Sequence, residues 1–231
     1  MSETVAEPCC LGDRTEERTT LPRRHIEIRG VTNPTILEAL RTVPRERFIS
    51  EGYGDAAFGD YPLPIGHGQT ISQPSIVALM SDALGVGPGD RVLEVGTGSG
   101  YQAAVLATLG CEVFTTEIIP ELAARAQTTL NSLGYDVTVG TIDGYFGWAE
   151  HGPFDGIIVT AAVNHVPAPL IEQLAPGAAL VAPIGSVDAT QTLYRFTVDS
   201  NGEVHSENLC SVVFVPLTGD DRRPRVRPPD E

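Results

Sequence analysis

The stretch of sequence that decides the fold is RVLEVGTGSGYQA, residues Arg91–Ala103. It starts with a mostly apolar run, Val92–Val95, which is typical of a buried strand, and continues into three glycines that alternate with Thr97 and Ser99. Glycine has no Cβ and adopts positive φ readily, so this turn lets a ligand approach the backbone closely. The Ala/Leu-rich segment that follows predicts a helix, whose first N–H groups face the same place.

Strand-like and helix-like segments alternate after this turn, which predicts a parallel, doubly wound α/β sheet. The last two strands, Thr192–Val198 and Val204–Pro216, flank an Asn-Gly turn and predict an antiparallel hairpin at one edge. We expect a mostly parallel, seven-stranded sheet with an N-terminal extension of helices and loops; the sequence leaves the order of its last two strands open. The other predicted strands after the turn are Glu112–Ile118, Asp136–Ile142, Phe154–Ala162 and Ala178–Ile184.

A second segment with chemical character precedes the glycine turn, at IGHGQTISQP, residues Ile65–Pro74. Two glycines and several hydroxyl and amide side chains stand before an apolar run of helical period, so Ser72 or Gln73 is expected at a helix N-terminus. Ser72 could be a helix cap or a ligand contact, and the two roles are compatible because a helix N-terminus also favours anions. Upstream, the Asn-Pro pair at 33–34 predicts another helix start, and residues 50–65 predict irregular structure.

The length of 231 residues fits one α/β domain with extensions. Residues 1–30 indicate a mobile N-terminal arm with a short ordered piece near His25–Ile28, residues 31–219 form the predicted domain, and residues 220–231 predict a disordered charged tail. No apolar run approaches the roughly 20 residues of a membrane span, and the N-terminus lacks the pattern of a signal peptide. We therefore expect a cytoplasmic protein without a membrane partner.

The charge pattern argues against a nucleic-acid partner. The net charge is −15, all 15 basic residues are arginines, and residues 31–218 carry 20 acids against six arginines. Nucleic acids are bound by basic surfaces, which this composition does not supply. The four cysteines form no CxxC pair and accompany no histidine cluster, so we expect free thiols and no metal site. We also expect a monomer.

Acidic residues at the ends of two predicted strands indicate that the glycine turn binds a nucleoside. Glu117 ends the strand after the turn, 21 residues beyond Gly96, where a carboxylate can accept hydrogen bonds from both ribose hydroxyls. Asp143-Gly144 ends the next strand, where an acid can accept the amino protons of adenine. The dinucleotide fingerprint requires a glycine where Tyr101 stands, which disfavours NAD or FAD.

The pattern Glu94-x-Gly96-x-Gly98-x-Gly100 resembles motif I of the class I methyltransferases, which use S-adenosylmethionine and release S-adenosylhomocysteine. The resemblance implies that backbone atoms of the turn hold the methionine part of the cofactor. The cofactor-binding residues that we expect on this basis are Glu94, Gly96, Thr97, Gly98, Gly100, Glu117, Ile118, Asp143 and Gly144.

A more specific resemblance covers roughly Asn33–Gly219. Five segments, in order, resemble the protein-L-isoaspartate (D-aspartate) O-methyltransferase family. The family implies methyl transfer from S-adenosylmethionine to the α-carboxylate of L-isoaspartyl residues in damaged proteins and peptides. The ester then forms a succinimide without the enzyme, and hydrolysis returns some normal aspartate. The matching segments are VPRERF at 43–48, LPIGHGQTISQP at 63–74, LEVGTGSGYQ at 93–102, PFDGIIVTAA at 153–162 and FVPL at 214–217.

The resemblance also implies the substrate side of the site. Ser72 corresponds to the family's active-site serine, and we expect it to hydrogen-bond the substrate carboxylate. A carboxylate is ionised at pH 7 and already a nucleophile, so no strong base is required and His67 is expected to be a loop residue. Ser75 departs from the family, which often has Tyr or His there beside the cofactor. The expected substrate-binding residues are Thr70, Ile71, Ala161, Ala162, Val163 and Val215.

Two other functions stay open at this point. A related methyltransferase could modify an aspartate side chain of one dedicated peptide during biosynthesis, and neither Ser72 nor the glycine turn distinguishes this from repair. A long additional recognition domain would favour that alternative, and the sequence shows none. A non-catalytic module that binds S-adenosylmethionine is the third possibility, which the intact GQTIS segment at 68–72 disfavours.

Overall fold

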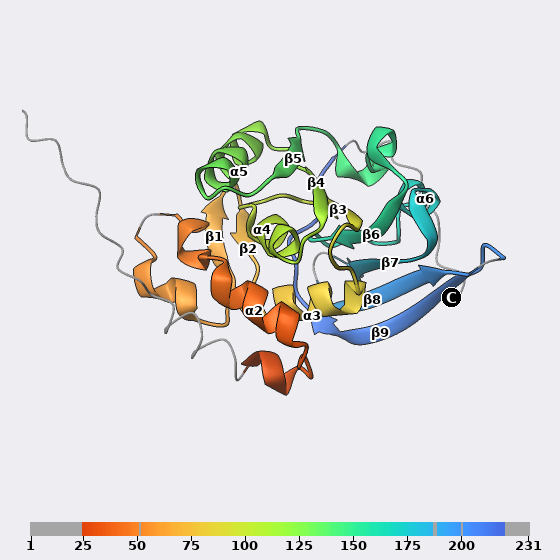
Figure 1. Ribbon diagram of the computed structural model, residues 1–231, viewed down its shortest axis with the longest axis horizontal. Coiled ribbons are helices and arrows are strands. Elements are labelled where there is room, and N and C mark those ends of the chain that lie inside the picture. The colour runs from red at the N-terminus through yellow and green to blue at the C-terminus, as the bar shows by residue number, and fades with distance from the viewer. Residues whose placement is uncertain (1–24, 51, 187–188, 200, 220–231) are drawn as a thin grey trace, which may run out of the picture.

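A seven-stranded sheet lies at the centre of the computed structural model, which describes residues 25–50, 52–186, 189–199 and 201–219 (Figure 1). The strand order is β5-β4-β3-β6-β7-β8-β9. The first five strands pair in parallel, and β8 pairs antiparallel with both β7 and β9. The predicted fold class and the hairpin are confirmed, and β8 and β9 pair in sequence order. The strands are β3 (Arg91–Val95), β4 (Glu112–Thr116), β5 (Val137–Gly140), β6 (Phe154–Val159), β7 (Leu174–Ile184), β8 (Gln191–Val198) and β9 (Val204–Val212).

Alternating side chains of the strands build two separate apolar layers. Val92 and Ile158 belong to one buried cluster, whereas their neighbours Leu93 and Ile157 belong to the other, because successive residues of a strand face opposite sides. Helices α2, α3 and α4 lie together over the first layer, and α6 covers the second (Figure 1). The α-helices are α2 (Pro34–Thr42), α3 (Pro74–Leu84), α4 (Tyr101–Thr108), α5 (Pro120–Ser132) and α6 (Ala168–Glu172), and the 3-10 helices are η1 (Arg45–Arg47), η2 (Gly54–Phe58), η3 (Gly144–Phe146) and η4 (Ala149–His151).

The connections place a crevice beside β3. The chain leaves β3 toward β4 on one side, and β6 later pairs with β3 on the other side. Ligands of open α/β sheets bind outside the carboxyl ends of the strands where the strand order reverses in this way. The glycine turn at 96–100 lies at this point. None of the described helices has both the length and the apolar character needed to cross a membrane.

The prediction of irregular structure at 50–65 is wrong in part. Residues 54–58 form η2, and a small antiparallel hairpin joins β1 (Leu63–Gly66) to β2 (Gln69–Ile71). Its turn carries positive φ at Gly66, His67 and Gly68, with φ of 54° at His67. The hairpin is tied to α5 because the Arg125 guanidinium donates a hydrogen bond to the carbonyl of Ile65.

The described part of the chain begins with a short helical segment. Residues 25–28 are helical, and Ile26 is only 3% exposed in the cluster that contains Ile36 and Leu40 of α2. The expected ordered piece at His25–Ile28 is therefore confirmed. The predictions for residues 1–24 and for the tail at 220–231 lie outside the described residues. Asn33 caps α2 as predicted, since its side chain accepts a hydrogen bond from the Thr35 N–H.

A buried arginine joins the N-terminal extension to the segment before α3. Arg45 is 3% exposed, and its Nη1 donates to the carbonyl of Ala57 at 2.6 Å. Its Nη2 donates to the carbonyls of Tyr61 (3.0 Å) and Ser72 (3.1 Å). Burial lowers the pKa of Arg45, and these carbonyl oxygens offset the cost of desolvating the guanidinium. Arg45 therefore fixes the backbone of Ser72 against η2 and the loop that follows it.

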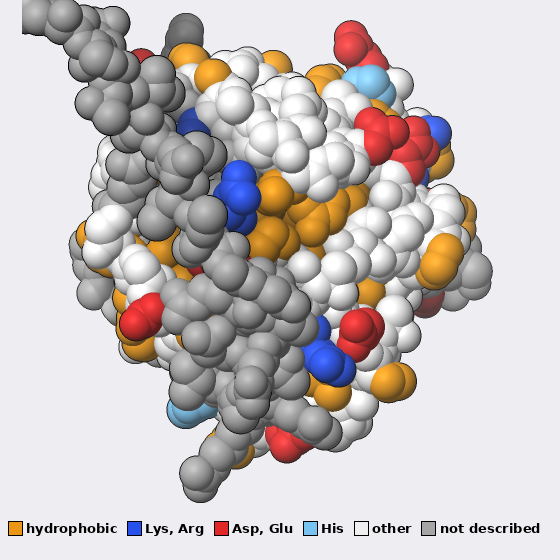
Figure 2. Space-filling model, turned by 60° about the vertical axis from the view of Figure 1, so that its left-hand side comes forward, with side chains coloured by type: hydrophobic (Ala, Val, Ile, Leu, Met, Phe, Trp, Pro, Cys, Tyr) orange, Lys and Arg blue, Asp and Glu red, His pale blue; other side chains and the backbone are white. Residues whose placement is uncertain are grey.

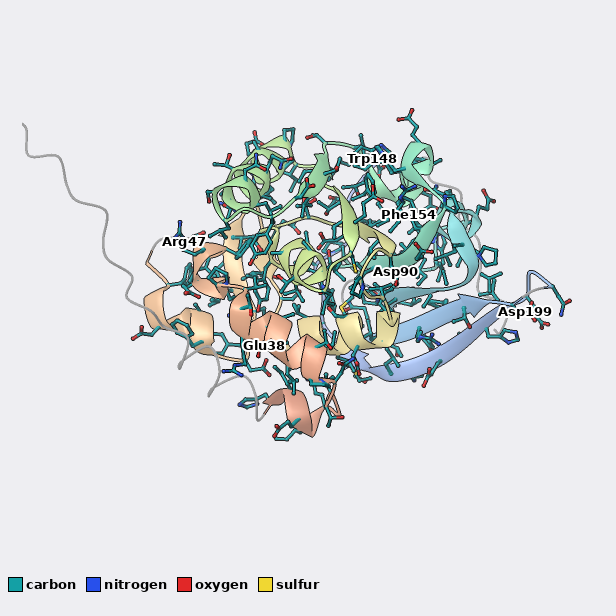
Figure 3. All side chains as sticks on the ribbon, in the orientation of Figure 1. Glu38, Arg47, Asp90, Trp148, Phe154 and Asp199 are labelled. Atoms are coloured by element: carbon teal, nitrogen blue, oxygen red, sulfur yellow. The ribbon has the colours of Figure 1, made fainter. Side chains whose placement is uncertain are left out.

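We expect Arg45→Lys to lower the free energy of unfolding by about 3 kcal/mol. A lysine ammonium lacks the planar fork that reaches several carbonyls at once, so buried acceptors lose their partners. Arg47→Lys is the matched control, because Arg47 is exposed two residues along the chain (Figure 3) and its replacement should change stability by less than about 0.5 kcal/mol. Urea unfolding of both variants measures the difference, and equal stabilities would contradict the role given to Arg45.

Candidate active site

Two cavities share a wall at the carboxyl edge of the sheet. The first is lined by the glycine turn, the ends of β3 and β4, part of β2 and the segment at 215–218. The second, of about 390 Å³, lies between the segment before α3, the strand end at 211–215 and Arg29. Four residues line both cavities, and they are Thr70, Ser72, Thr160 and Val215.

The backbone of the glycine turn is packed closely between neighbouring strands. Gly96 has φ of 102°, and its N–H donates to the carbonyl of Thr116 at 2.9 Å. A Cβ added at Gly96 would lie 2.6 Å from Thr160 Oγ1, which itself donates to the Gly96 carbonyl at 2.6 Å. Gly98, with φ of 53°, donates its N–H to Glu117 Oε2 at 2.9 Å. The turn therefore needs glycine at 96 both for its conformation and for space.

Glu117 is fixed at the carboxyl end of β4, where it lines the first cavity. The side chain is largely buried, at 7% exposure. Its Oε2 accepts the Gly98 N–H, and its Oε1 accepts the Ile119 N–H at 3.0 Å. Because a carboxylate oxygen can accept more than one hydrogen bond, Glu117 keeps acceptor capacity for a ligand hydroxyl.

Glu94 in β3 brings a buried carboxyl group to the same cavity. Its Oε2 accepts from Thr115 Oγ1 at 2.7 Å, and Thr115 is in turn 2.7 Å from Thr97 Oγ1. Its Oε1 is buried without a hydrogen-bond partner among the described residues. Desolvation by burial raises the pKa of Glu94 to about 8, and the nearby charge of Glu117 adds to the rise. A buried carboxyl with one unused oxygen suits a ligand that carries positive charge, such as an ammonium group.

Ser72 stands between β2 and α3, on the wall common to both cavities. The helix begins where expected, because Gln73 occupies the N-cap position, although its side chain makes no cap hydrogen bond. Ser72 is therefore not the cap. Asp60 takes that role from 15 residues upstream, accepting the Ser75 N–H at Oδ1 and the Ser75 hydroxyl at Oδ2, both at 2.8 Å. Ser75 is therefore turned toward Asp60 and lines neither of the two cavities.

The structure brings most of the predicted substrate residues together. Ile71 and Ala161 line the first cavity, in addition to Thr70, Ser72 and Val215 on the shared wall. Ala162 and Val163 line neither cavity. The Ala162 N–H donates to the carbonyl of Val215 at 2.7 Å, so Ala162 instead holds the segment at 215–218 in place. The exposed His67 lies in the β1–β2 turn, away from both cavities.

The predicted cofactor residues also gather at the first cavity, with two exceptions. Gly100 is the N-cap of α4 and packs against Leu130. Asp143 is the N-cap of η3, where its Oδ1 accepts the Tyr145 N–H at 3.0 Å. The predicted residues that line the first cavity are Glu94, Gly96, Thr97, Gly98, Glu117, Ile118 and Gly144.

Several lining residues were not predicted from the sequence, and two of them, Thr160 and Arg29, matter most for the chemistry of the site. Thr160 follows β6 and contacts the glycine turn; its place after the apolar run FDGIIV was a usable signal, because carboxyl ends of parallel strands meet at one edge. Arg29 lies in the segment that the sequence assigned to the N-terminal arm, and no local pattern marks it. It is the only charged residue among the described residues of the second cavity.

An acidic group at the tip of the β8–β9 hairpin is explained by the turn itself (Figure 3). Donor atoms of Asp199, Glu203 and His205 lie within 4.8 Å of one another. Asp199 Oδ1 accepts the N–H groups of Asn201 (2.8 Å) and Glu203 (2.9 Å), which lowers the pKa of Asp199. The carboxylate therefore stabilises the turn and is remote from the two cavities.

Comparisons with known proteins agree with this geometry. The model of the family described as protein-L-isoaspartate(D-aspartate) O-methyltransferase matches residues 17–222. A protein-L-isoaspartate O-methyltransferase from Gloeobacter violaceus is 53% identical over 191 residues, which cover 82% of this chain and 93% of that protein.

Solved structures show the same similarity. One protein-L-isoaspartate O-methyltransferase structure has a TM-score of 0.79 and 28% identity, and the match covers 89% of this chain and 66% of that one. Another, from Plasmodium falciparum in complex with S-adenosyl-L-homocysteine, has a TM-score of 0.76 and 27% identity, with 90% and 99% covered. The chain belongs to the protein-L-isoaspartate(D-aspartate) O-methyltransferase family.

Proposed function

We propose that this protein is an enzyme that transfers a methyl group from S-adenosylmethionine to the α-carboxylate of L-isoaspartyl residues in damaged proteins. The observation that carries the proposal is the position of Ser72 on the wall shared by two cavities. One cavity has the features of a cofactor site and the other is open for a peptide. The family membership and the names of relatives at about half identity support the same activity.

The residues of the first cavity fit S-adenosylmethionine. The unused Oε1 of Glu94 suits the ammonium group of the methionine part, and the Glu117 carboxylate suits the ribose hydroxyls. Gly96 and Gly98 leave room for close approach to the backbone. When bound, the cofactor supplies a methyl group on a positively charged sulfur. The residues of this chain contribute binding and orientation.

The residues of the shared wall fit the methyl-accepting carboxylate. Ser72 presents a hydroxyl that can donate to one carboxylate oxygen, and Thr70 and Thr160 line the same place. A carboxylate is ionised at neutral pH, so the chain needs no base to create the nucleophile. One carboxylate oxygen forms the new bond to the methyl carbon as the bond from that carbon to sulfur breaks. Catalysis then rests on alignment of these atoms, which is worth several orders of magnitude in rate.

The cytoplasmic location and the monomeric state stay predictions from the sequence. Isoaspartyl-containing proteins and peptides are the substrates that the family membership supports.

We expect methyl transfer from labelled S-adenosylmethionine to a peptide that contains L-isoaspartate, and no transfer to the matched peptide with normal aspartate. Both peptides carry the same net charge, so the comparison isolates the position of the α-carboxylate relative to the main chain. Labelling of the isoaspartyl peptide alone supports repair. Labelling of the aspartyl peptide instead would support the dedicated-peptide alternative, and labelling of neither, with the cofactor still bound, would reject both.

Substitutions should separate the two halves of the site. We expect Ser72→Ala to lower kcat about 10- to 100-fold while the Kd for S-adenosylhomocysteine changes less than about twofold, because only the substrate carboxylate loses a donor. Glu117→Ala should raise that Kd about tenfold or more, because a hydrogen-bonded carboxylate is lost. Ser132→Ala, exposed in α5, serves as the control. Equal effects of the first two variants on kcat and on Kd would contradict this division.

The pKa of Glu94 gives a third prediction. At pH 7 a carboxyl with a pKa of about 8 is mostly protonated, and an ammonium beside it would favour ionisation. We expect S-adenosylhomocysteine binding at pH 7 to release nearly one proton, and Glu94→Gln to release correspondingly less. Calorimetric titration in buffers of different ionisation enthalpy measures this number. Equal proton release by both proteins would contradict the assignment.

A measurement without ligand checks the same group. Glu94 ionises near 4.5 in the unfolded chain but near 8 in the folded protein, so the folded state holds about one extra proton between these values. The free energy of unfolding should therefore fall as the pH rises from about 4.5 to 8. Glu94→Gln should remove that part of the decline.

A further inference from the structure

The second cavity contains one fixed positive charge. Arg29 follows the helical residues 25–28 and lines this cavity, but it does not line the cavity that holds the glycine turn. The other described lining residues are apolar or carry hydroxyl or amide groups. A ligand in this cavity therefore meets a single charged side chain among the described residues, and that side chain is cationic.

The Arg29 side chain is held in place by buried neighbours. Its Nε donates to Ser75 Oγ at 2.9 Å, and Ser75 is fully buried and anchored to Asp60. The half-buried Cys210 of β9 lies beside Arg29, since both line a neighbouring cavity. A guanidinium has five N–H donors in one plane, so these contacts leave donors for a carboxylate. Because the guanidinium is already oriented, the Arg29 side chain would lose little conformational entropy when a ligand binds to it.

The negative net charge of the protein makes a cation in the second cavity important for binding an anionic peptide. A net charge of −15 opposes the approach of an anionic peptide, although salt screens this effect beyond about 8 Å at physiological ionic strength. Within that distance, a nearby charged side chain contributes more than the net charge of the protein to the interaction with a ligand. Figure 2 shows one face of the molecule, on which both basic and acidic side-chain atoms lie near a patch of hydrophobic side chains.

The position of Arg29 separates it from the methyl-accepting group. That carboxylate must reach Ser72 on the shared wall, whereas Arg29 lines the part of the site beyond it and also borders a neighbouring cavity with Asp60. Because Ser72 lines both cavities, we expect a peptide that places its isoaspartyl carboxylate at Ser72 to extend neighbouring residues into the second cavity. A second carboxylate, on one of those neighbours, is the group that suits the guanidinium.

We propose that Arg29 binds the side-chain carboxylate of an acidic residue next to the isoaspartyl residue, and so makes the enzyme prefer acidic peptide segments. The inference rests on the proposed function. It assigns a specificity-determining role to a residue of the N-terminal extension.

The test compares isoaspartyl peptides that carry Glu or Gln at the residue before, or at the residue after, the isoaspartate. The wild type should show a kcat/KM about threefold to tenfold higher with Glu than with Gln at one of these positions, mainly through KM. Arg29→Gln should reduce this ratio to about one, and Arg29→Lys should keep part of it because the charge is retained. Each ratio is taken within one variant, so a uniform change in the activity of that variant cancels and the ratio reports only the Glu preference.

Arg41→Gln is the matched control, because it removes the same charge from an exposed site on α2 that lines neither cavity. It should keep the Glu preference. A second measurement needs no variant: raising ionic strength from about 0.1 M to about 1 M should shrink the wild-type preference, since the screening length falls to about 3 Å.

A wild type without preference at either position, or a preference that Arg29→Gln leaves intact, would overturn this inference alone. Failure of the wild type to methylate any isoaspartyl peptide would overturn the proposed function and this inference with it.

Discussion

The site depends on how closely the backbone at Gly96 is packed between two strands. Its N–H is bonded to Thr116 at the end of β4, and its carbonyl is bonded to the Thr160 hydroxyl after β6. A Cβ there would lie 2.6 Å from Thr160 Oγ1, so Thr160 would have to move and its hydrogen bond to the turn would be disturbed. This close approach draws the carboxyl ends of β3, β4 and β6 to one point. Glu117 and Thr160 therefore face the same cavity without requiring loops of their own.

The same packing explains the state of Glu94. A carboxyl in the middle of the sheet loses its hydration, and the Thr115 hydroxyl offsets only part of that loss, so burial dominates and the pKa rises to about 8. The free protein thus holds a neutral acid at the cavity. A cationic group of a ligand would stabilise the ionised form of Glu94. Part of the binding free energy for such a ligand would then come from relief of a desolvation cost that folding imposes.

The sheet was predictable because each strand and helix carries its signal within a few adjacent residues. The β1–β2 hairpin was missed because its strands have four and three residues and include Pro64 and Gly66, which obscure any alternation. The position of Ser72 before α3 was predictable. That Ser72 does not cap the helix was not predictable, because the cap is Asp60, which reaches the Ser75 N–H only in the folded chain. Thr160 was missed for the same kind of reason, since its contact with the turn depends on β3 and β6 being neighbours.

The two halves of the site are held by different kinds of interaction, and this has a consequence for how the protein can vary. The glycine turn is fixed by hydrogen bonds of its own backbone, and a side chain at Gly96 would come too close to Thr160 Oγ1. Ser72 is fixed by the side chain of Arg45, and the second cavity is bordered by Arg29, both from the N-terminal extension outside the sheet. Side-chain contacts of this kind can be changed by single substitutions. A substitution in the glycine turn would instead disturb the backbone that forms the cavity. Changes in the extension could therefore alter the choice of peptide while the proposed cofactor side stays intact.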